Sequence, residues 1–157
     1  MQQLRLVGAA IMTLGALVLG FSWLQVRTGR WSHVDASNHG ERNSLNIFLG
    51  ALCLLSAALL WILTRWSNMA VALTLAGALI IVALTLSAWV KVSLHAAFAA
   101  FATTLLWPNR AAVVVGVLVT AAVVWSRLVL ERHVAADVTA GLLLGGAAGG
   151  GYHVWVV

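Results

Sequence analysis

Long apolar stretches alternate with short polar breaks along the whole chain. Six stretches are apolar enough to form membrane-crossing helices, at residues 6–26, 45–63, 69–90, 92–107, 111–125 and 134–157. A helix needs about 20 residues to cross the hydrocarbon, so the fourth and fifth stretches need their flanking residues to reach across it. Helices are expected because a strand edge left open in lipid has unsatisfied backbone groups. The pattern predicts an all-α, polytopic bundle of six transmembrane helices, forming a single membrane-embedded domain over residues 1–157.

Tryptophans lie at or near the ends of these stretches, where an amphipathic ring suits the boundary between lipid and water. They are Trp23, Trp31, Trp61, Trp66, Trp89, Trp107, Trp125 and Trp155. The only proline, Pro108, lies in the short break before residue 111 and favours a tight turn between two helices there. Both features agree with the proposed limits of the spans.

Glycines recur at intervals of four in the last stretch, at Gly141, Gly145 and Gly149, with Gly146 and Gly150 beside them. Such a row makes one face of a helix smooth, so the backbone of another helix can approach it closely. The spacing does not indicate a nucleotide-binding loop, because no strand precedes it. Tight helix packing is the interpretation we prefer.

Composition agrees with a membrane location. Hydrophobic residues make up 62% of the chain and charged residues 8%, against about a quarter charged in an average soluble domain. The formal net charge is +5, but the basic residues are dispersed through short breaks and form no basic run. This dispersal argues against nucleic acid as a partner and favours membrane lipids or a phosphate substrate. We expect an integral, multi-pass protein of the bacterial cytoplasmic (inner) membrane.

Six crossings would place the breaks at 27–44, 91–93 and 126–133 on one face of the membrane. Almost every unusual polar residue lies in these three breaks. The same face carries most of the arginine and lysine, which the positive-inside rule would place in the cytoplasm. Cations that bind substrate should not be counted in that rule, so the side that the active site faces stays open.

The most informative segment is 126–137, which ends one break and begins the last stretch. His133 and Asp137 are four residues apart at the start of a predicted helix, so their side chains can share a face. A carboxylate there can fix the tautomer of the imidazole and leave the other ring nitrogen free to attack. Arg127 offers a planar fork suited to phosphate oxygens. Charged residues within the membrane are costly to bury there, so they are candidates for a functional role.

A second polar cluster, Lys91, Ser93 and His95, opens the fourth stretch. A helix N-terminus presents free N–H groups and a positive dipole end to an anion, and Ser93 adds a hydroxyl. His95 could act as a general acid toward a leaving oxygen. A third polar region runs from Asp35 to Arg42, just before the second stretch.

These segments resemble a known superfamily. Segment 126–137 has the pattern Ser-Arg, five residues, His133, three residues, Asp137. This pattern is similar to the third signature of the type 2 phosphatidic acid phosphatase superfamily, which includes vanadium haloperoxidases. Its second signature, Pro-Ser-Gly-His, corresponds to residues 92–95 at Ser93 and His95 only. The signatures follow in family order and cover roughly residues 35–137.

The first signature of that superfamily, Lys, six residues, Arg-Pro, is matched least well. Arg42 takes the place of the arginine, whereas Asp35 stands where lysine is expected and Asn43 where proline is expected. We hypothesise that Lys91, two residues before Ser93, supplies the missing charge. Whether Asp35 lowers activity stays open.

The resemblance implies a mechanism without metal or cofactor. His133 would attack phosphorus to give a phosphohistidine, and Asp137 would orient it. His95 would protonate the departing lipid oxygen and then assist the attack of water. The phosphoryl oxygens would be held by four residues with cationic or hydroxyl groups, namely Arg127, Ser93, Arg42 and Lys91.

The sequence therefore predicts a lipid phosphatase acting on a phosphomonoester or diphosphate. A polyprenyl phosphate or diphosphate is favoured, and phosphatidic acid or phosphatidylglycerol phosphate comes next. One alternative is a lipid phosphotransferase that uses the same site but passes the group to an alcohol. Another is a catalytically inactive or transport-type relative, in which the charges serve packing or ion passage. The oligomeric state stays open.

Overall fold

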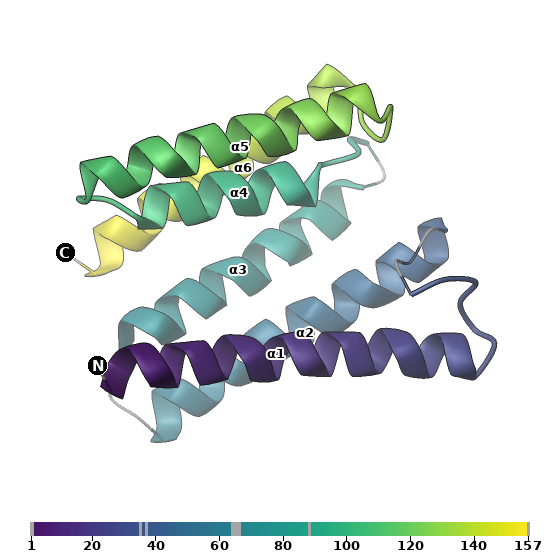
Figure 1. Cartoon of the computed structure of the whole chain (residues 1–157), viewed down its shortest axis with the longest axis horizontal. Coiled ribbons are helices and arrows are strands. Elements are labelled where there is room, and N and C mark those ends of the chain that lie inside the picture. The colour runs from purple at the N-terminus through teal and green to yellow at the C-terminus, as the bar shows by residue number, and fades with distance from the viewer. Residues whose placement is uncertain (1, 35, 37, 64–66, 88, 157) are drawn as a thin grey trace. The chain divides into compact units, whose positions relative to one another are not determined.

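The computed structural model describes residues 2–34, 36, 38–63, 67–87 and 89–156, with the backbone alone for residues 2–11 and 67. Within these residues the fold is all-helical, as predicted (Figure 1). The helices are α1 (Gln2–Arg27), α2 (His39–Leu63), α3 (Ser67–Leu86), α4 (Leu94–Leu105), α5 (Arg110–Val129) and α6 (Ala135–Val156). The backbone groups of each helix pair within that helix, which suits a chain with so few polar side chains.

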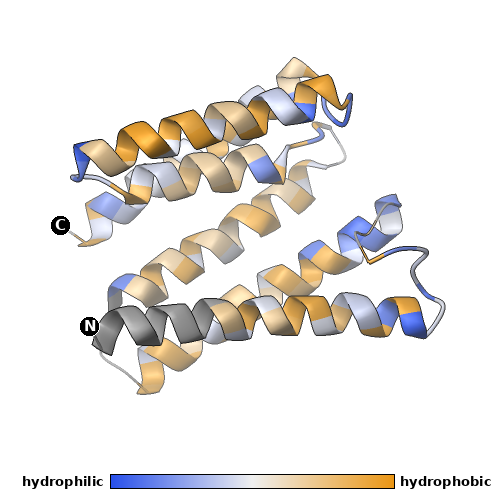
Figure 2. Cartoon of the chain, viewed as in Figure 1, coloured by the Kyte–Doolittle hydropathy of each residue, from blue (hydrophilic) through white to orange (hydrophobic). Residues whose placement is uncertain are grey.

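Among the residues that the structure describes, three helices are long and apolar enough to cross a membrane, over His39–Leu63, Asn68–Leu86 and Arg110–Val129. The prediction of six spans is thus confirmed for three of them. Helix α4 has 12 residues and rises only about 18 Å, against about 30 Å of hydrocarbon. Helix α6 is long enough, but its glycines have no apolar side chain to raise its hydropathy. Figure 2 shows the hydrophilic residues gathered mainly toward helix ends and the hydrophobic ones along the helices.

Several helix limits differ from the apolar stretches because capping groups, and not hydropathy, decide them. Helix α2 begins at His39 instead of residue 45, since Asn38 precedes it and the amide of Asn38 donates to Glu41 Oε2 over 3.1 Å. This is the reciprocal half of a capping box. Helix α5 begins at Arg110, where Asn109 Oδ1 accepts from the amide of Ala112 over 3.1 Å. The first turn of α2 and the first residue of α5 are therefore helical although they are polar or charged.

The chain divides into two compact units, Met1–Leu49 and Gly50–Val157, and α2 contributes to both. In the first unit, Phe21 stacks on Phe48 with ring centroids 4.0 Å apart and meets Trp31 edge-on at 5.6 Å. Trp31 is 6% exposed. Its assignment to an interfacial belt is therefore wrong, because its ring fills the aromatic core of this unit.

The other tryptophans that the structure describes are all exposed, as the belt prediction requires of them. They are Trp23, Trp61, Trp89, Trp107, Trp125 and Trp155. Trp66 lies outside the described residues. Exposure near helix ends thus separates these six rings from Trp31.

The connection between α1 and α2 is organised by the carboxylate of Glu41. Its Oε1 accepts from the amide of Ser32 over 2.7 Å and from the hydroxyl of Ser32 over 3.0 Å. Together with the bond from Asn38, these contacts satisfy a carboxylate that is 7% exposed. These bonds order the connection between the two helices.

In the second unit, α4 packs along α6, and α5 packs mainly on α4 (Figure 1). Gly141, Gly145 and Gly149 all face α4, so the prediction of close packing through this row is confirmed. A Cβ added at Gly146 or Gly150 would meet nothing within 4 Å. Only one of the two glycine rows is therefore used for packing inside the described structure.

Apolar side chains of α3 and α4 form the core of the second unit, with Leu79 and Phe101 as its largest members. Cys53 of α2 packs against this cluster as a small hydrophobic side chain. Helices α4 and α5 are also joined by a hydrogen bond of 2.9 Å between the hydroxyls of Thr103 and Thr120. These contacts hold α4 between α5 and α6, with its N-terminus beside the start of α6.

Candidate active site

The end of α5 determines where the following residues of the candidate site lie. Glu131 has a φ of +50° and donates its amide to Leu128 O over 3.1 Å. The amide of Arg132 donates to Arg127 O over 3.1 Å. This pair of bonds around a left-handed residue is a Schellman motif, which reverses the chain immediately after a helix. The amide of His133 also donates to Arg127 O, over 3.3 Å. The five-residue spacing between Arg127 and His133 is thus the length of this turn.

Replacing Glu131 with glycine should stabilise the protein by roughly 1 kcal/mol, because glycine adopts a positive φ without a steric cost. Thermal unfolding of the purified protein in detergent measures this change. The matched control is Arg132→Gly, at the neighbouring position, which does not have a positive φ. Glycine there should destabilise. An equal effect of both substitutions would contradict the role of the left-handed residue.

His133 and Asp137 form a pair at the start of α6, as the spacing predicted. His133 Nδ1 lies 3.2 Å from Asp137 Oδ2, and both side chains are largely buried. The same oxygen accepts from the amide of Val134 over 3.3 Å. Asp137 therefore caps α6 and holds the imidazole by Nδ1, which leaves Nε2 as the ring nitrogen available for other chemistry.

Ser93 is brought to this pair by a main-chain contact between α4 and α6. It occupies the N-cap position of α4 with a φ of −77° and a ψ of 97°. Its amide donates to Asp137 O over 3.1 Å, and the residue is 0% exposed. A serine at this position usually accepts a bond from an amide of the first helical turn. Ser93 makes no such cap bond.

Two buried polar atoms of this region have no hydrogen-bond partner among the described residues, Ser93 Oγ and Arg127 Nε. A buried polar group without a partner costs about 1–3 kcal/mol, so such groups are rare without a reason. The hydroxyl and the guanidinium N–H are both donors. An anion with several acceptor oxygens is the kind of ligand that would satisfy them.

His95 lies in the first turn of α4, two residues after Ser93. It interacts electrostatically with Arg127 and with His133. Its side chain is on the exposed side of the helix, whereas Ser93 is buried. The structure therefore brings together five of the predicted residues, and they are His133, Asp137, His95, Ser93 and Arg127.

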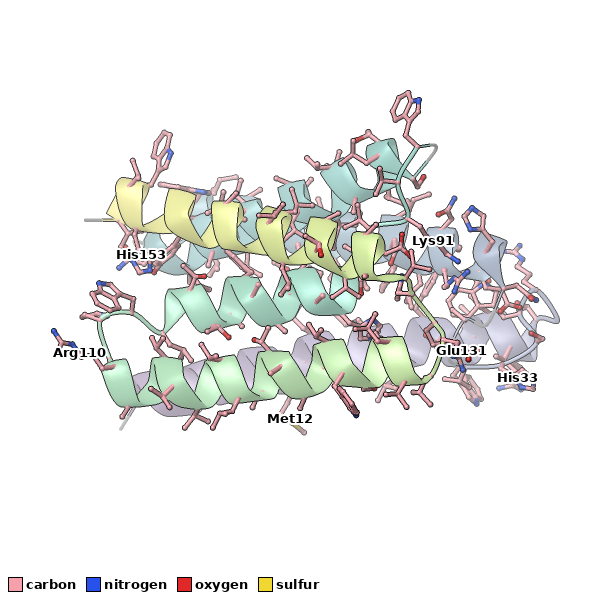
Figure 3. The ribbon with its side chains drawn as sticks, turned by 90° about the horizontal axis from the view of Figure 1, so that it is seen from above. Met12, His33, Lys91, Arg110, Glu131 and His153 are labelled. Atoms are coloured by element: carbon pink, nitrogen blue, oxygen red, sulfur yellow. The ribbon has the colours of Figure 1, made fainter. Side chains whose placement is uncertain are left out.

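The remaining predicted residues are placed differently. Lys91 is exposed in the non-helical segment before α4, at the same end of the second unit as Glu131 and opposite to Arg110 and His153 (Figure 3). Arg42 lies in the first turn of α2, in the other unit, where its amide donates to Asn38 O over 3.0 Å. A phosphate-binding role for Lys91 or Arg42 stays a prediction. Asp35 lies outside the described residues.

One contact of the site was not predicted from the sequence. A Cβ added at Gly141 would lie 2.5 Å from Ser93 O, so the row of glycines on α6 reaches into the candidate site. The signal was present, since Gly141 is one turn after Asp137, but the sequence does not reveal which helix faces the row. At the other end of α6, His153 is hydrogen-bonded through Nε2 to Thr104 O over 2.8 Å.

The chain was also compared with known proteins. No family model, no curated protein and no solved structure matches it. The resemblance to the type 2 phosphatidic acid phosphatase superfamily therefore rests on the signature residues of the sequence alone.

Proposed function

We propose that this chain is an integral membrane lipid phosphatase similar to the type 2 phosphatidic acid phosphatases. It would hydrolyse a phosphomonoester or diphosphate of a lipid, with polyprenyl substrates favoured and phosphatidic acid or phosphatidylglycerol phosphate next. The proposal includes six membrane passages in a bacterial cytoplasmic membrane. One observation carries it. Ser93 Oγ is buried and has no hydrogen-bond partner among the described residues, while the amide of Ser93 donates to the main-chain oxygen of Asp137, the partner of His133.

The proposed reaction has two steps. His133 Nε2 attacks phosphorus, a P–N bond forms, and the P–O bond to the lipid breaks as His95 gives a proton to the departing oxygen. Water then attacks the phosphohistidine while His95 takes its proton, and the P–N bond breaks to release inorganic phosphate. Asp137 holds the imidazole, and Ser93 and Arg127 stabilise the charge on the phosphoryl oxygens.

A role in packing alone explains these residues less well. Asp137 would still cap α6, and His133 would still be its partner. However, a packing role gives no reason for the buried Ser93 hydroxyl and the buried Arg127 Nε–H both to lack a hydrogen-bond partner among the described residues. Bound phosphate oxygens would satisfy both.

The proposal is tested by phosphate release from polyprenyl and glycerolipid phosphates, with detergent-purified protein in EDTA. Metal-independent release by the wild type is expected, with one lipid clearly preferred. Product that appears only when an alcohol acceptor is added would identify a phosphotransferase instead. No turnover of any lipid by folded protein, with or without acceptor, would support the inactive or transport-type alternative.

Ser93→Ala should separate activity from stability. We expect kcat to fall by about 10- to 100-fold, because one donor to the transition-state oxygens is lost. Stability should stay the same or rise, because the substitution removes a buried hydroxyl that has no partner among the described residues. Phosphate release and thermal unfolding are measured on the same preparation.

The matched control is Thr103→Val, which removes the hydrogen bond to Thr120 away from the site. It should lower stability and leave kcat unchanged. If Ser93→Ala destabilised the protein and lost activity only in proportion, the hydroxyl would be structural and the proposal would lose its main support.

A further inference from the structure

Three glycines of α6 meet α4 in different places. A Cβ at Gly145 would run into Ala97 O, and a Cβ at Gly149 would run into the side chain of Thr104. The neighbour of Gly141 is the peptide of Ser93, whose carbonyl oxygen would lie 2.5 Å from an added Cβ. Real Cβ atoms essentially never come within 3.0 Å of a heavy atom outside their own and the adjacent residues. Each position thus requires glycine, but only Gly141 contacts a residue of the candidate site.

The backbone of Ser93 is held through both its amide and its carbonyl group. Its amide donates to Asp137 O over 3.1 Å, and its carbonyl accepts from the amide of Ala97 over 3.0 Å. Gly141 lies one helical turn after Asp137, so its lack of a side chain lets the N-terminus of α4 approach this turn of α6. The distance between the two helices here also determines where the unpartnered Ser93 Oγ lies relative to His133.

We propose that Gly141 is a positioning residue for the phosphoryl site: it holds the hydroxyl-bearing N-terminus of α4 against the His133–Asp137 pair. This inference rests on the proposed function. A side chain at this position would push Ser93 away from Asp137. A misplacement of about 1 Å in a catalytic constellation can lower a rate about a hundredfold.

The test compares Gly141→Ala with Gly149→Ala, which is crowded by α4 but far from Ser93, and with Gly146→Ala, where the space is open. We expect Gly141→Ala to lower kcat at least about tenfold with little change in KM, because the Ser93 hydroxyl acts mainly on the transition state. Gly149→Ala should lower the unfolding temperature and retain kcat per folded molecule. Gly146→Ala should change neither.

Hydrogen exchange of the Ser93 amide supplies a second measurement that does not depend on activity. This amide is bonded to Asp137 O, so it should exchange faster in Gly141→Ala and keep its protection in Gly149→Ala. A wild type without phosphatase activity would remove the proposed function, and exchange would still report whether Gly141 positions Ser93. Unchanged exchange in Gly141→Ala would overturn the positioning role itself.

A milder variant covers the case in which Gly141→Ala does not fold. Ala96 is 0% exposed, and its Cβ would lie 3.3 Å from a Cβ at position 141, so Ala96→Ser intrudes on the same contact from the side of α4. Like Gly141→Ala, it should lower kcat and reduce the protection of the Ser93 amide from hydrogen exchange. If Gly141→Ala, Ala96→Ser and Gly149→Ala all lost activity only in proportion to their loss of folded protein, the glycine would serve packing alone.

Discussion

Replacing His133 with alanine is expected to lower phosphate release by at least about a thousandfold, because loss of a nucleophile removes the covalent route entirely. The wild type should also form a phosphoprotein when it is mixed with labelled lipid phosphate and quenched rapidly. His133→Ala should form none. Asp137 leaves Nε2 of this imidazole available for attack by contacting Nδ1 at 3.2 Å, which is why His133 and not His95 is expected to carry the phosphoryl group.

The control for this prediction is His153→Ala, at the opposite end of the second unit (Figure 3). Its imidazole is bonded to Thr104 O and has no part in the proposed reaction. His153→Ala should therefore have the same kcat per folded molecule as the wild type. Labelled phosphoprotein that persists in His133→Ala and is lost in His95→Ala would reverse the roles of the two histidines.

Replacing Arg127 with lysine is expected to lower kcat by about 100- to 1,000-fold, although the charge is retained. Arginine presents a planar fork of N–H groups to phosphate oxygens, whereas lysine presents a single ammonium on a flexible stem. Arg127 Nε is buried without a partner among the described residues, and this N–H has no equivalent in lysine. Steady-state rates with the preferred lipid measure the effect.

Arg132→Lys is the matched control, since Arg132 follows in the same turn and is exposed. It should retain the wild-type kcat, because its side chain is placed with the solvated part of the connection. A similar loss in both variants would mean that Arg127 contributes only positive charge to the site. Full activity in Arg127→Lys would remove the guanidinium fork from the proposed mechanism.

Local features of the site were predictable because they depend on short stretches of chain. The i to i+4 spacing of His133 and Asp137 is sufficient to bring their side chains together once the helix forms. By contrast, the start of α2 at His39 was missed, because the hydrogen bonds of Glu41 to Ser32 and Asn38 decide it and hydropathy does not.

The sequence by itself determined that this protein is helical and where most of its helices lie, because apolar stretches of this length have few other ways to satisfy their backbone in lipid. It also determined the candidate residues at the start of α6. Only the tertiary structure decided that Ser93 meets Asp137, that Gly141 faces Ser93 and that Trp31 is buried. These contacts join residues distant in the chain, and they depend on how closely whole helices pack, which is set by the volumes of side chains on both partners.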